Sequence, residues 1–467
     1  MTGPAMAGPA MTGPAMAVRL TPLQPWIAAM IGATGPGLDR AHLQRYQLAR
    51  LRSTVRLARQ RAPFYRDRLR DLPDGADGPD TLRDFARYPF TTAADLAAHG
   101  PRMVCVGQDD VTRVVTTQEQ QEQLAALDTS GTTGTPKRLW FTESDQELTI
   151  DFFRVGMSTF TDPGDRVLVL LPCERPGGVG DLLATALERL GARAIRHGVV
   201  QDVEATLALL HDHGADVAVG IPAQLLALAR RDAGLRLKAV LLSTDHVPLS
   251  LARAVEQAWH CRVFNHYGMT ETGLGGGVEC EARRGYHLRE ADLYVEAVEP
   301  NGTRPMPDGE RGEVVVTTLT RTGMPLIRYR TGDLSRFIPG PCPCGTDLRT
   351  LERITGRAAG VVRTATGAGL TLAELDEVLF GLPGVLDFDA TLLRGATGDT
   401  LVLDLRVAAG PGAPGPDPDT VAAALNVIPA LVPGPPGRGV GARITVRPAT
   451  AVAAPAKRRL KVVDRDA

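Results

Sequence analysis

The sequence predicts an α/β protein: a large N-terminal domain with helix-covered, mostly parallel sheets plus a β-rich part, and a small α+β C-terminal domain. Three observations lead to this prediction. The chain has 467 residues, which is enough for a large and a small domain. Short apolar runs alternate with helical segments through the middle of the chain. The character of the sequence then changes after Gly356 and Arg357.

The N-terminal part begins with a repetitive segment. Residues 1–17, MTGPAMAGPAMTGPAMA, repeat a five-residue unit without a periodic apolar face, so we expect a disordered tail. From Asp39 onward, apolar residues recur every three or four positions as far as Ala62. This spacing predicts an amphipathic helix that ends near Pro63, with its arginines on a solvated face.

The middle of the chain predicts a parallel sheet covered by helices. Its apolar runs are VLVLL (167–171), DVAVG (216–220), AVLLS (239–243) and CRVF (261–264). Helical segments such as 181–190 and 249–259 alternate with these runs. The alternation is typical of strands joined by crossover helices.

Strand-rich and mixed segments follow. LYVEAV (293–298) and EVVVTTL (313–319) predict two strands, separated by a turn-rich stretch. LAELDEVLF (372–380), DFDATLL (387–393) and TLVLDLRVA (400–408) predict a small α+β unit. We therefore expect a tail at 1–17, a large domain at 18–356 and a small domain at 357–467.

Charge and composition exclude several classes of protein. Lys and Arg number 52 against 53 Asp and Glu, so no overall field attracts nucleic acid or an anionic membrane. No apolar run reaches the roughly eighteen residues of a spanning helix, and the N-terminus lacks the features of a secretory signal. We expect a cytoplasmic protein with no membrane or nucleic-acid partner. Its six cysteines are then expected to be thiols or metal ligands.

The loop LDTSGTTGTPKRLWF, at 127–141, has the composition of an anion site. Glycines free backbone N–H groups, hydroxyls add donors, and Lys137 adds a positive charge. It is not the Gly-x-x-x-x-Gly-Lys-Ser/Thr loop of common NTPases, because Pro136 stands where the second glycine would be. The same proline argues against a kinase, which would transfer the γ-phosphate of ATP.

Four motifs in order along the chain carry a family resemblance. They are Thr129–Lys137, Tyr267-Gly268-Met269-Thr270-Glu271, Tyr329-Arg330-Thr331-Gly332-Asp333 and Ile354-Thr355-Gly356-Arg357. In this order and spacing they resemble the adenylate-forming superfamily of acyl-CoA synthetases and adenylation domains. The chain looks most like the phenylacetate-CoA ligase branch, because of Ala62–Arg66, Arg328-Tyr329-Arg330 and Val462-Val463-Asp464.

This resemblance implies an AMP-forming carboxylate-CoA ligase with a hinge between its two domains. Such an enzyme uses ATP and Mg²⁺ to convert a small carboxylic acid, aromatic in this branch, to an acyl-adenylate with release of pyrophosphate. The acyl group then passes to the thiol of CoA. The sequence leaves the identity of the acid and the oligomeric state open.

The resemblance also implies roles for individual residues. Glu271 would help to hold Mg²⁺, and Thr270 would contact the α-phosphate. Asp333 would accept hydrogen bonds from the ribose, supported by Arg357. The remaining expected nucleotide-binding residues are Thr129, Ser130, Gly131, Thr132, Thr133, Gly134 and Lys137 around the phosphates, Ser243, Thr244 and Asp245 along the adenine, and Tyr267 with Gly268. The acyl pocket would lie between Pro172–Gly180 and the residues Asn265 and His266.

Two features of the C-terminal part depart from the family pattern. The family's terminal lysine corresponds best to Lys457, with Arg458 and Lys461 as alternatives. Alanine occupies position 359, where an aspartate or lysine usually stands beside the hinge. Two alternatives therefore stay open: transfer of the acyl group to a carrier protein or an amine, and a non-catalytic, zinc-containing relative that acts as a binding module.

A second group of residues predicts a metal site. Cys280 and His287 are separated by six residues, and Cys342 and Cys344 by one proline. Three thiols and an imidazole suit a structural Zn²⁺ with four protein ligands, and some members of the ligase branch look similar at these positions. Separate, unrelated thiols are the alternative.

Overall fold

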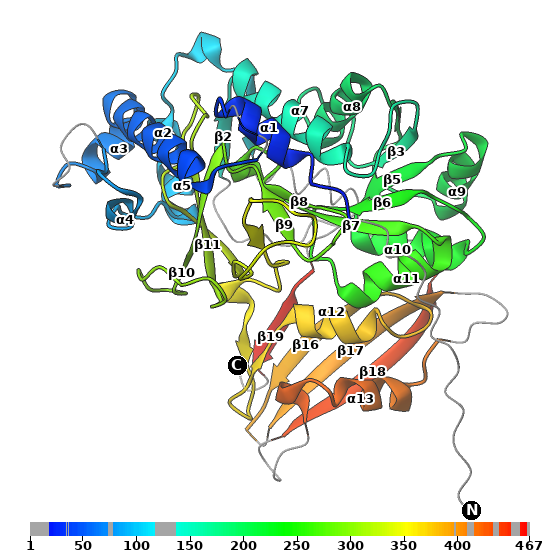
Figure 1. The fold of residues 1–467 in the computed structure, drawn as a ribbon. Helices are drawn as coiled ribbons and strands as arrows, with labels where there is room; N and C mark the ends of the chain where they lie inside the picture. Colours follow the sequence, from blue (N-terminus) through cyan, green and yellow to red (C-terminus); the bar gives the residue numbers. More distant parts are fainter. Residues whose placement is uncertain are drawn as a thin grey trace, which may run out of the picture.

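The computed structural model describes residues 18–33, 35, 37–72, 78–116, 137–396, 398–408, 415–432, 439–449 and 458–464. The tail predicted at 1–17 lies outside the described residues. Figure 1 shows a large body and, below it, a smaller unit built on a separate sheet.

An eight-stranded sheet forms the centre of the body, in the order β13-β9-β8-β7-β6-β5-β3-β4. Five neighbouring strands run parallel: β3 (Arg166–Leu170), β4 (Arg193–Arg196), β5 (Val217–Gly220), β6 (Ala239–Leu242) and β7 (Arg262–Tyr267). Four of them, β3, β5, β6 and β7, are the predicted strands, whereas the sequence did not indicate β4. An antiparallel extension continues it through β8 (Gly277–Glu279), β9 (Tyr286–Leu288) and β13 (Thr350–Leu351). Strands of two or three residues are too short to show a period-two pattern, so the sequence did not indicate this extension.

Helices cover both faces of the parallel strands. Leu168 and Leu170 of β3 point into one core with α9 (Val203–Asp212), α10 (Pro222–Arg231) and α11 (Leu249–Trp259). Val167 and Val169 point into the opposite core with α7 (Glu143–Met157) and α8 (Val179–Leu190). Because successive side chains of a strand face opposite sides, a strand buried on both faces is apolar throughout. This explains the continuous apolar run that the sequence shows.

The N-terminal helices pack beside this sheet. They are α1 (Leu23–Met30), α2 (Arg40–Arg61), α3 (Pro63–Arg68), α4 (Leu82–Phe85) and α5 (Ala93–His99), followed by the 3₁₀ turns η1 (Gly100–Met103) and η2 (Gln108–Asp110). The Asp39 side chain caps α2 by accepting a hydrogen bond from the backbone N–H of Ala41 at 2.9 Å. The predicted early helix is thus confirmed, including its end just before Pro63.

Two smaller antiparallel sheets complete the body. One joins β10 (Leu293–Val298), β11 (Gly312–Thr318) and β12 (Tyr329–Ser335), and the other joins β1 (Arg113–Thr116) to β2 (Arg138–Phe141). The first is the predicted β-rich part. Its third strand, β12, contains the Tyr-Arg-Thr-Gly-Asp motif.

The C-terminal unit has a four-stranded sheet in the order β18-β17-β16-β19, covered by two helices (Figure 1). Its elements are η4 (Ala358–Gly360), β14 (Val362–Arg363), β15 (Gly369–Leu370), α12 (Leu372–Leu379), β16 (Val385–Arg394), β17 (Asp399–Ala408), α13 (Pro418–Leu425), η5 (Pro429–Leu431), β18 (Val440–Ala449) and β19 (Leu460–Asp464). Helix α12 lies next to α11, and the unit shares an apolar core with α10 and α11. The predicted fold class is confirmed, whereas the exact domain boundaries stay a prediction.

Candidate active site

The candidate site lies where β7 ends. Tyr267 is the last residue of this strand, and the 3₁₀ turn η3 (Thr270–Thr272) follows it. The turn is tight because a side chain at Gly268 would place its Cβ 2.3 Å from the Leu274 carbonyl oxygen. Carboxyl ends of parallel strands are the usual place for ligand sites in open α/β sheets.

Three side chains meet around the Glu271 carboxylate. Lys137 Nζ donates to Glu271 Oε1 at 2.5 Å, and the Tyr329 hydroxyl donates to the same oxygen at 2.8 Å. Lys137 Nζ also lies 3.4 Å from the Tyr329 hydroxyl oxygen. Glu271 is buried, while Lys137 keeps part of its surface exposed. The structure thus brings together two predicted site residues and adds Tyr329, for which the sequence indicated no role.

The electrostatics of this cluster favour the charged form of Glu271. Burial by itself raises the pKa of the carboxyl, but the Lys137 ammonium and the two hydrogen bonds hold the pKa below its ordinary value. Burial and the neighbouring Glu271 carboxylate raise the pKa of Tyr329, so its hydroxyl stays a donor. The result is an anionic oxygen site beside a partly exposed cation.

Asp333 forms a second cluster on the adjoining strand β12. The Tyr267 hydroxyl donates to Asp333 Oδ2 at 3.0 Å, and Arg357 Nε donates to Oδ1 at 2.9 Å. An isolated antiparallel β-bridge pairs the backbones of Asp333 and Arg357, so the start of the C-terminal unit lies at this point. Asp333 is buried, and burial raises its pKa, while Arg357 and Tyr267 oppose that effect.

Arg321 supports η3 from inside the protein. It is 6% exposed, and its Nη1 donates to the backbone carbonyl of Glu271 at 3.0 Å. Its guanidinium lies 4.9 Å from the centre of the Phe141 ring. The sequence did not indicate this residue's role, because nothing in its local pattern links it to a turn fifty positions earlier.

The structure describes only some of the other predicted site residues. Thr129, Ser130, Gly131, Thr132, Thr133, Gly134 and Lys457 lie outside the described residues. Thr270 is buried in η3. Thr244 and Asp245 are exposed after β6, whereas the Ser243 side chain is buried and hydrogen-bonds to His266. Of the three residues expected along the adenine, Ser243 therefore faces an apolar pocket. Thr244 and Asp245 are the two that remain exposed.

Arg458, one alternative for the terminal lysine, is bound within the C-terminal unit. Its Nη1 donates to Asp376 Oδ1 at 2.6 Å, and its guanidinium lies 4.7 Å and 5.2 Å from the ring centres of Phe380 and Phe388. Its Nε lies 4.0 Å from Asp245 Oδ2 on the body. A guanidinium held by a carboxylate and two aromatic rings is poorly placed to move with the α-phosphate during adenylation. Lys461, the other alternative, is exposed on β19.

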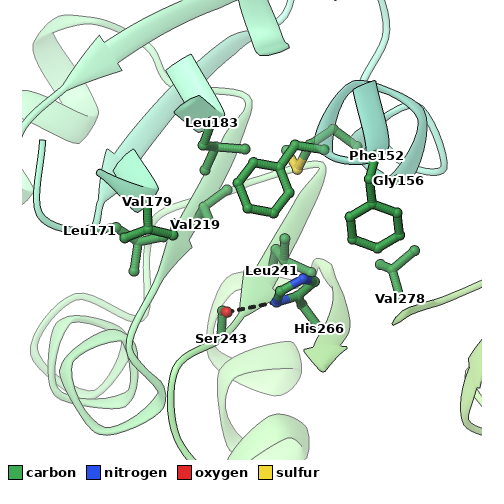
Figure 2. Close-up of a pocket in the computed structure, with 12 residues that line it drawn as sticks. Phe152, Gly156, Leu171, Val179, Leu183, Val219, Leu241, Ser243, His266 and Val278 are labelled. Atoms are coloured by element: carbon green, nitrogen blue, oxygen red, sulfur yellow. Dashed lines mark hydrogen bonds between the residues drawn. The ribbon is translucent and has the colours of Figure 1, made fainter. Parts of the chain in front are cut away.

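An apolar pocket lies beside the end of β7 (Figure 2). Its lining comes from α7, α8, the strands β5, β6, β7 and β8, and the residues that directly follow β3 and β6. Figure 2 shows Ser243 and His266 joined by a hydrogen bond at its lower side. The predicted acyl pocket overlaps with it through Val179 and His266, and Leu171, which also lines it, directly precedes the predicted loop. Asn265 does not line it; that residue is buried, and its backbone N–H donates to Glu279.

The four predicted metal ligands come together at a separate place. Cys280, His287, Cys342 and Cys344 are all buried, and their ligand atoms lie within 4.8 Å of one another. Cys280 Sγ lies 3.7 Å from Cys342 Sγ, and Cys344 Sγ lies 3.4 Å from His287 Nε2. Tetrahedral Zn²⁺ with bonds of about 2.3 Å to sulfur and about 2.0 Å to nitrogen requires separations of about 3.8 Å and 3.5 Å for such pairs. The donor set and its spacing therefore fit Zn²⁺.

Sequence comparisons give consistent matches. The model of the family described as AMP-binding enzyme matches residues 46–320. The phenylacetate-coenzyme A ligase of Thermus thermophilus is 30% identical over 386 residues, which cover 79% of this chain and 82% of that protein. The phenylacetate-coenzyme A ligase of Pseudomonas putida is 30% identical over 328 residues, covering 68% of this chain and 71% of that protein.

Structure comparisons agree on the fold. A 2-hydroxyisobutyryl-CoA ligase in the postadenylation state, in complex with 2-HIB-AMP, has a TM-score of 0.76 at 22% identity, covering 92% of this chain and 91% of that chain. The same ligase with 2-HIB-AMP and CoA in the thioesterification state has a TM-score of 0.61 at 24% identity, covering 91% and 90%. Across the part of the chain that the structure describes, no helix has the length and apolarity needed to cross a membrane.

Proposed function

Because this chain belongs to the AMP-binding enzyme family, whose model matches it over residues 46–320, we propose that it is an AMP-forming carboxylate-CoA ligase. The carboxylate of a small acid attacks the α-phosphorus of ATP, and the bond to pyrophosphate breaks. The thiol of CoA then attacks the acyl carbon of the adenylate, and AMP leaves. ATP and CoA are the co-substrates, and the resemblance to phenylacetate-CoA ligases favours an aromatic acid.

One observation carries this proposal. The Lys137, Glu271 and Tyr329 cluster, the Asp333 and Arg357 pair, and an apolar pocket all lie at or near the end of β7 and the neighbouring strand β12. In the proposed reaction an anion attacks a polyanion, so fixed cations and oxygen ligands are needed beside a site for the acid. Structural proteins have no comparable need to hold a buried glutamate against a lysine and, close by, a buried aspartate against an arginine.

Glu271 supplies a carboxylate for Mg²⁺ in this proposal, and Lys137 moves to the phosphates. Mg²⁺ prefers oxygen ligands and would neutralise charge on the phosphates. Until ATP binds, Lys137 keeps the buried Glu271 carboxylate paired. Asp333 holds the ribose hydroxyls, and Lys457 remains the proposed lysine of the adenylation step.

The cluster of Cys280, His287, Cys342 and Cys344 is proposed to hold one structural Zn²⁺. All four positions would be filled by protein, so the metal would have no open position for chemistry. His287 Nδ1 lies 3.4 Å from the Arg349 carbonyl oxygen, which suits a metal-bound imidazole whose second nitrogen carries its proton. The cytoplasmic location expected from the sequence stays a prediction.

The test is a panel of aryl, arylacetic and short aliphatic acids incubated with ATP and Mg²⁺, with and without CoA. We expect pyrophosphate with at least one acid, and continuous AMP release only when CoA is present. Formation of ADP, or the absence of pyrophosphate across the panel, would contradict the proposal. Pyrophosphate with no effect of CoA would favour transfer to a carrier protein or an amine, which the alanine at the hinge, Ala359, keeps open.

A further inference from the structure

The lining of the apolar pocket is almost free of polar groups. Of the twelve residues that line it, all but Ser243 and His266 are apolar or glycine. The space amounts to about 390 Å³ with its open mouth included. Because that figure includes open solvent, the enclosed part of the pocket is smaller and suits only a compact group.

The two polar side chains form a fixed pair. Ser243 Oγ lies 2.9 Å from His266 Nδ1 (Figure 2). The ring centres of Phe152 and Phe153 lie 6.0 Å and 5.9 Å from the imidazole. A Cβ at Gly268 would come within 2.7 Å of His266 Cε1, so backbone also limits the ring on this side. The imidazole therefore presents its second nitrogen in one direction.

That second nitrogen, Nε2, is buried and has no hydrogen-bond partner among the residues that the structure describes. Burial lowers the pKa of His266 to about 4, so the imidazole is neutral near pH 7. A neutral imidazole has one donor and one acceptor nitrogen, and the serine hydroxyl can serve either of them. A buried polar atom without a partner carries a cost that a suitable ligand group removes.

We propose that Ser243 and His266 select an acid that carries one neutral hydroxyl or aryl amino group on a compact, otherwise apolar skeleton. A hydroxyl or amino group can donate or accept, so it suits either tautomer of the pair. A charged substituent is disfavoured because the rest of the lining cannot solvate it. This inference rests on the proposed function, since it treats the pocket as the acyl site of the ligase.

The first test compares acids that differ by one group. Phenylacetic acid is assayed beside its ring-hydroxyl, ring-amino and ring-methyl isomers, with kcat/KM taken from pyrophosphate release at saturating ATP. We expect one hydroxyl or amino isomer to exceed both the parent acid and the matching methyl isomer on the order of tenfold or more. The methyl isomers control for size. Equal values for the three kinds of acid would overturn the proposal.

Substitutions then locate the source of the preference. An asparagine at position 266 places its amide near the former Nδ1, whereas a glutamine reaches the former Nε2. We expect His266→Asn to lose the preference and His266→Gln to keep part of it. Ser243→Ala removes only the hydroxyl, and it should lower the ratio of kcat/KM for the substituted acid to kcat/KM for the parent acid. A ratio of substituted to parent acid that is unchanged in His266→Asn and Ser243→Ala would overturn the proposal.

Binding of the same acids to the full chain, measured as Kd by calorimetry without ATP, separates this inference from the proposed function. A lower Kd for a substituted acid, lost in His266→Asn, would support the selectivity even if no acid released pyrophosphate. In that case only the ligase reaction would fail. Equal Kd values, or no binding of any substituted acid, would overturn the selectivity even if the parent acid were turned over.

Discussion

Tyr329 illustrates how one hydroxyl affects two charged groups. It donates to Glu271 Oε1 at 2.8 Å and lies 3.4 Å from Lys137 Nζ. Burying a carboxylate is costly unless hydrogen bonds and an opposite charge compensate it. With Tyr329 in place, Glu271 can exchange its lysine for another cation without losing every partner.

Replacing Tyr329 by phenylalanine should change the pH dependence of the reaction. The hydroxyl stabilises the carboxylate form of Glu271, whose pKa lies below its ordinary value. The wild type should therefore keep Glu271 ionised until the pH falls through that lowered pKa. In Tyr329→Phe the pKa rises, so the acid limb of kcat/KM for ATP should move to higher pH. A pH–rate profile checks this, and an unmoved acid limb would show that Glu271 ionisation does not limit the reaction.

Replacing Asp333 by asparagine should weaken ATP binding. The substitution removes the anion that pairs with Arg357 Nε and accepts from the Tyr267 hydroxyl, besides its proposed bonds to the ribose. Hydrogen bonds to a charged group contribute about 1.5–3 kcal/mol, so we expect the Kd for ATP to rise by about tenfold to a hundredfold.

Calorimetric titration of ATP measures this Kd, with Asp389→Asn as a control. Asp389 pairs with Arg406 on the sheet of the C-terminal unit and is exposed. Equal ATP affinity in Asp333→Asn and the wild type would refute the ribose role, provided that both proteins have the same Tm.

At the scale of elements, α12 of the C-terminal unit caps a helix of the body. Glu377 accepts hydrogen bonds from the backbone N–H groups of Leu249 at 2.7 Å and Ser250 at 2.9 Å. These are the first two residues of α11, whose N-terminus carries partial positive charge. From the body, Arg230 of α10 donates to the carbonyls of Phe380 and Leu382, which directly follow the C-terminal end of α12 where Glu377 lies.

Removing this cap should loosen the contact between α11 and α12. We expect Glu377→Ala to lower the free energy of unfolding by about 0.5–1 kcal/mol, at the low end for caps because the side chain is exposed. Urea denaturation measures the loss, and hydrogen exchange at Leu249 and Ser250 should become faster. Glu310→Ala, in an exposed turn, is the control. Unchanged exchange at both amides would mean that the cap contributes nothing in solution.

At the scale of the whole molecule, the proposed zinc site joins distant parts of the chain. Cys280 follows β8, His287 lies in β9, and Cys342 and Cys344 lie in the loop before β13. These elements form the antiparallel edge of the large sheet. Such short strands contribute few backbone hydrogen bonds to one another, so a metal at this edge would add to the local stability.

Removing the metal should therefore affect stability before chemistry. We expect about one zinc per chain in protein purified without chelator, and a fall in Tm of about 5 °C or more in Cys342→Ser or after chelation. Elemental analysis and thermal denaturation check this, with Cys261→Ser as a control because that cysteine lies outside the cluster. A wild type without metal would end the zinc proposal.

The sequence by itself determined the alternation of strands and helices in the middle of the chain, the early helix and the family resemblance. These features are encoded locally: apolar runs, a period of three to four residues, and motifs of five to ten positions. It also indicated that Cys280, His287, Cys342 and Cys344 belong together, because thiols and an imidazole point to one kind of ligand.

Only the tertiary structure decided which side chains meet. Tyr329 reaches Glu271 because β12 begins beside η3, and Arg321 reaches the same turn through the interior. Arg458 is bound to Asp376, although the sequence allowed it as the terminal catalytic residue. Such contacts depend on strand register and on the burial of charges across long separations, which no local pattern records.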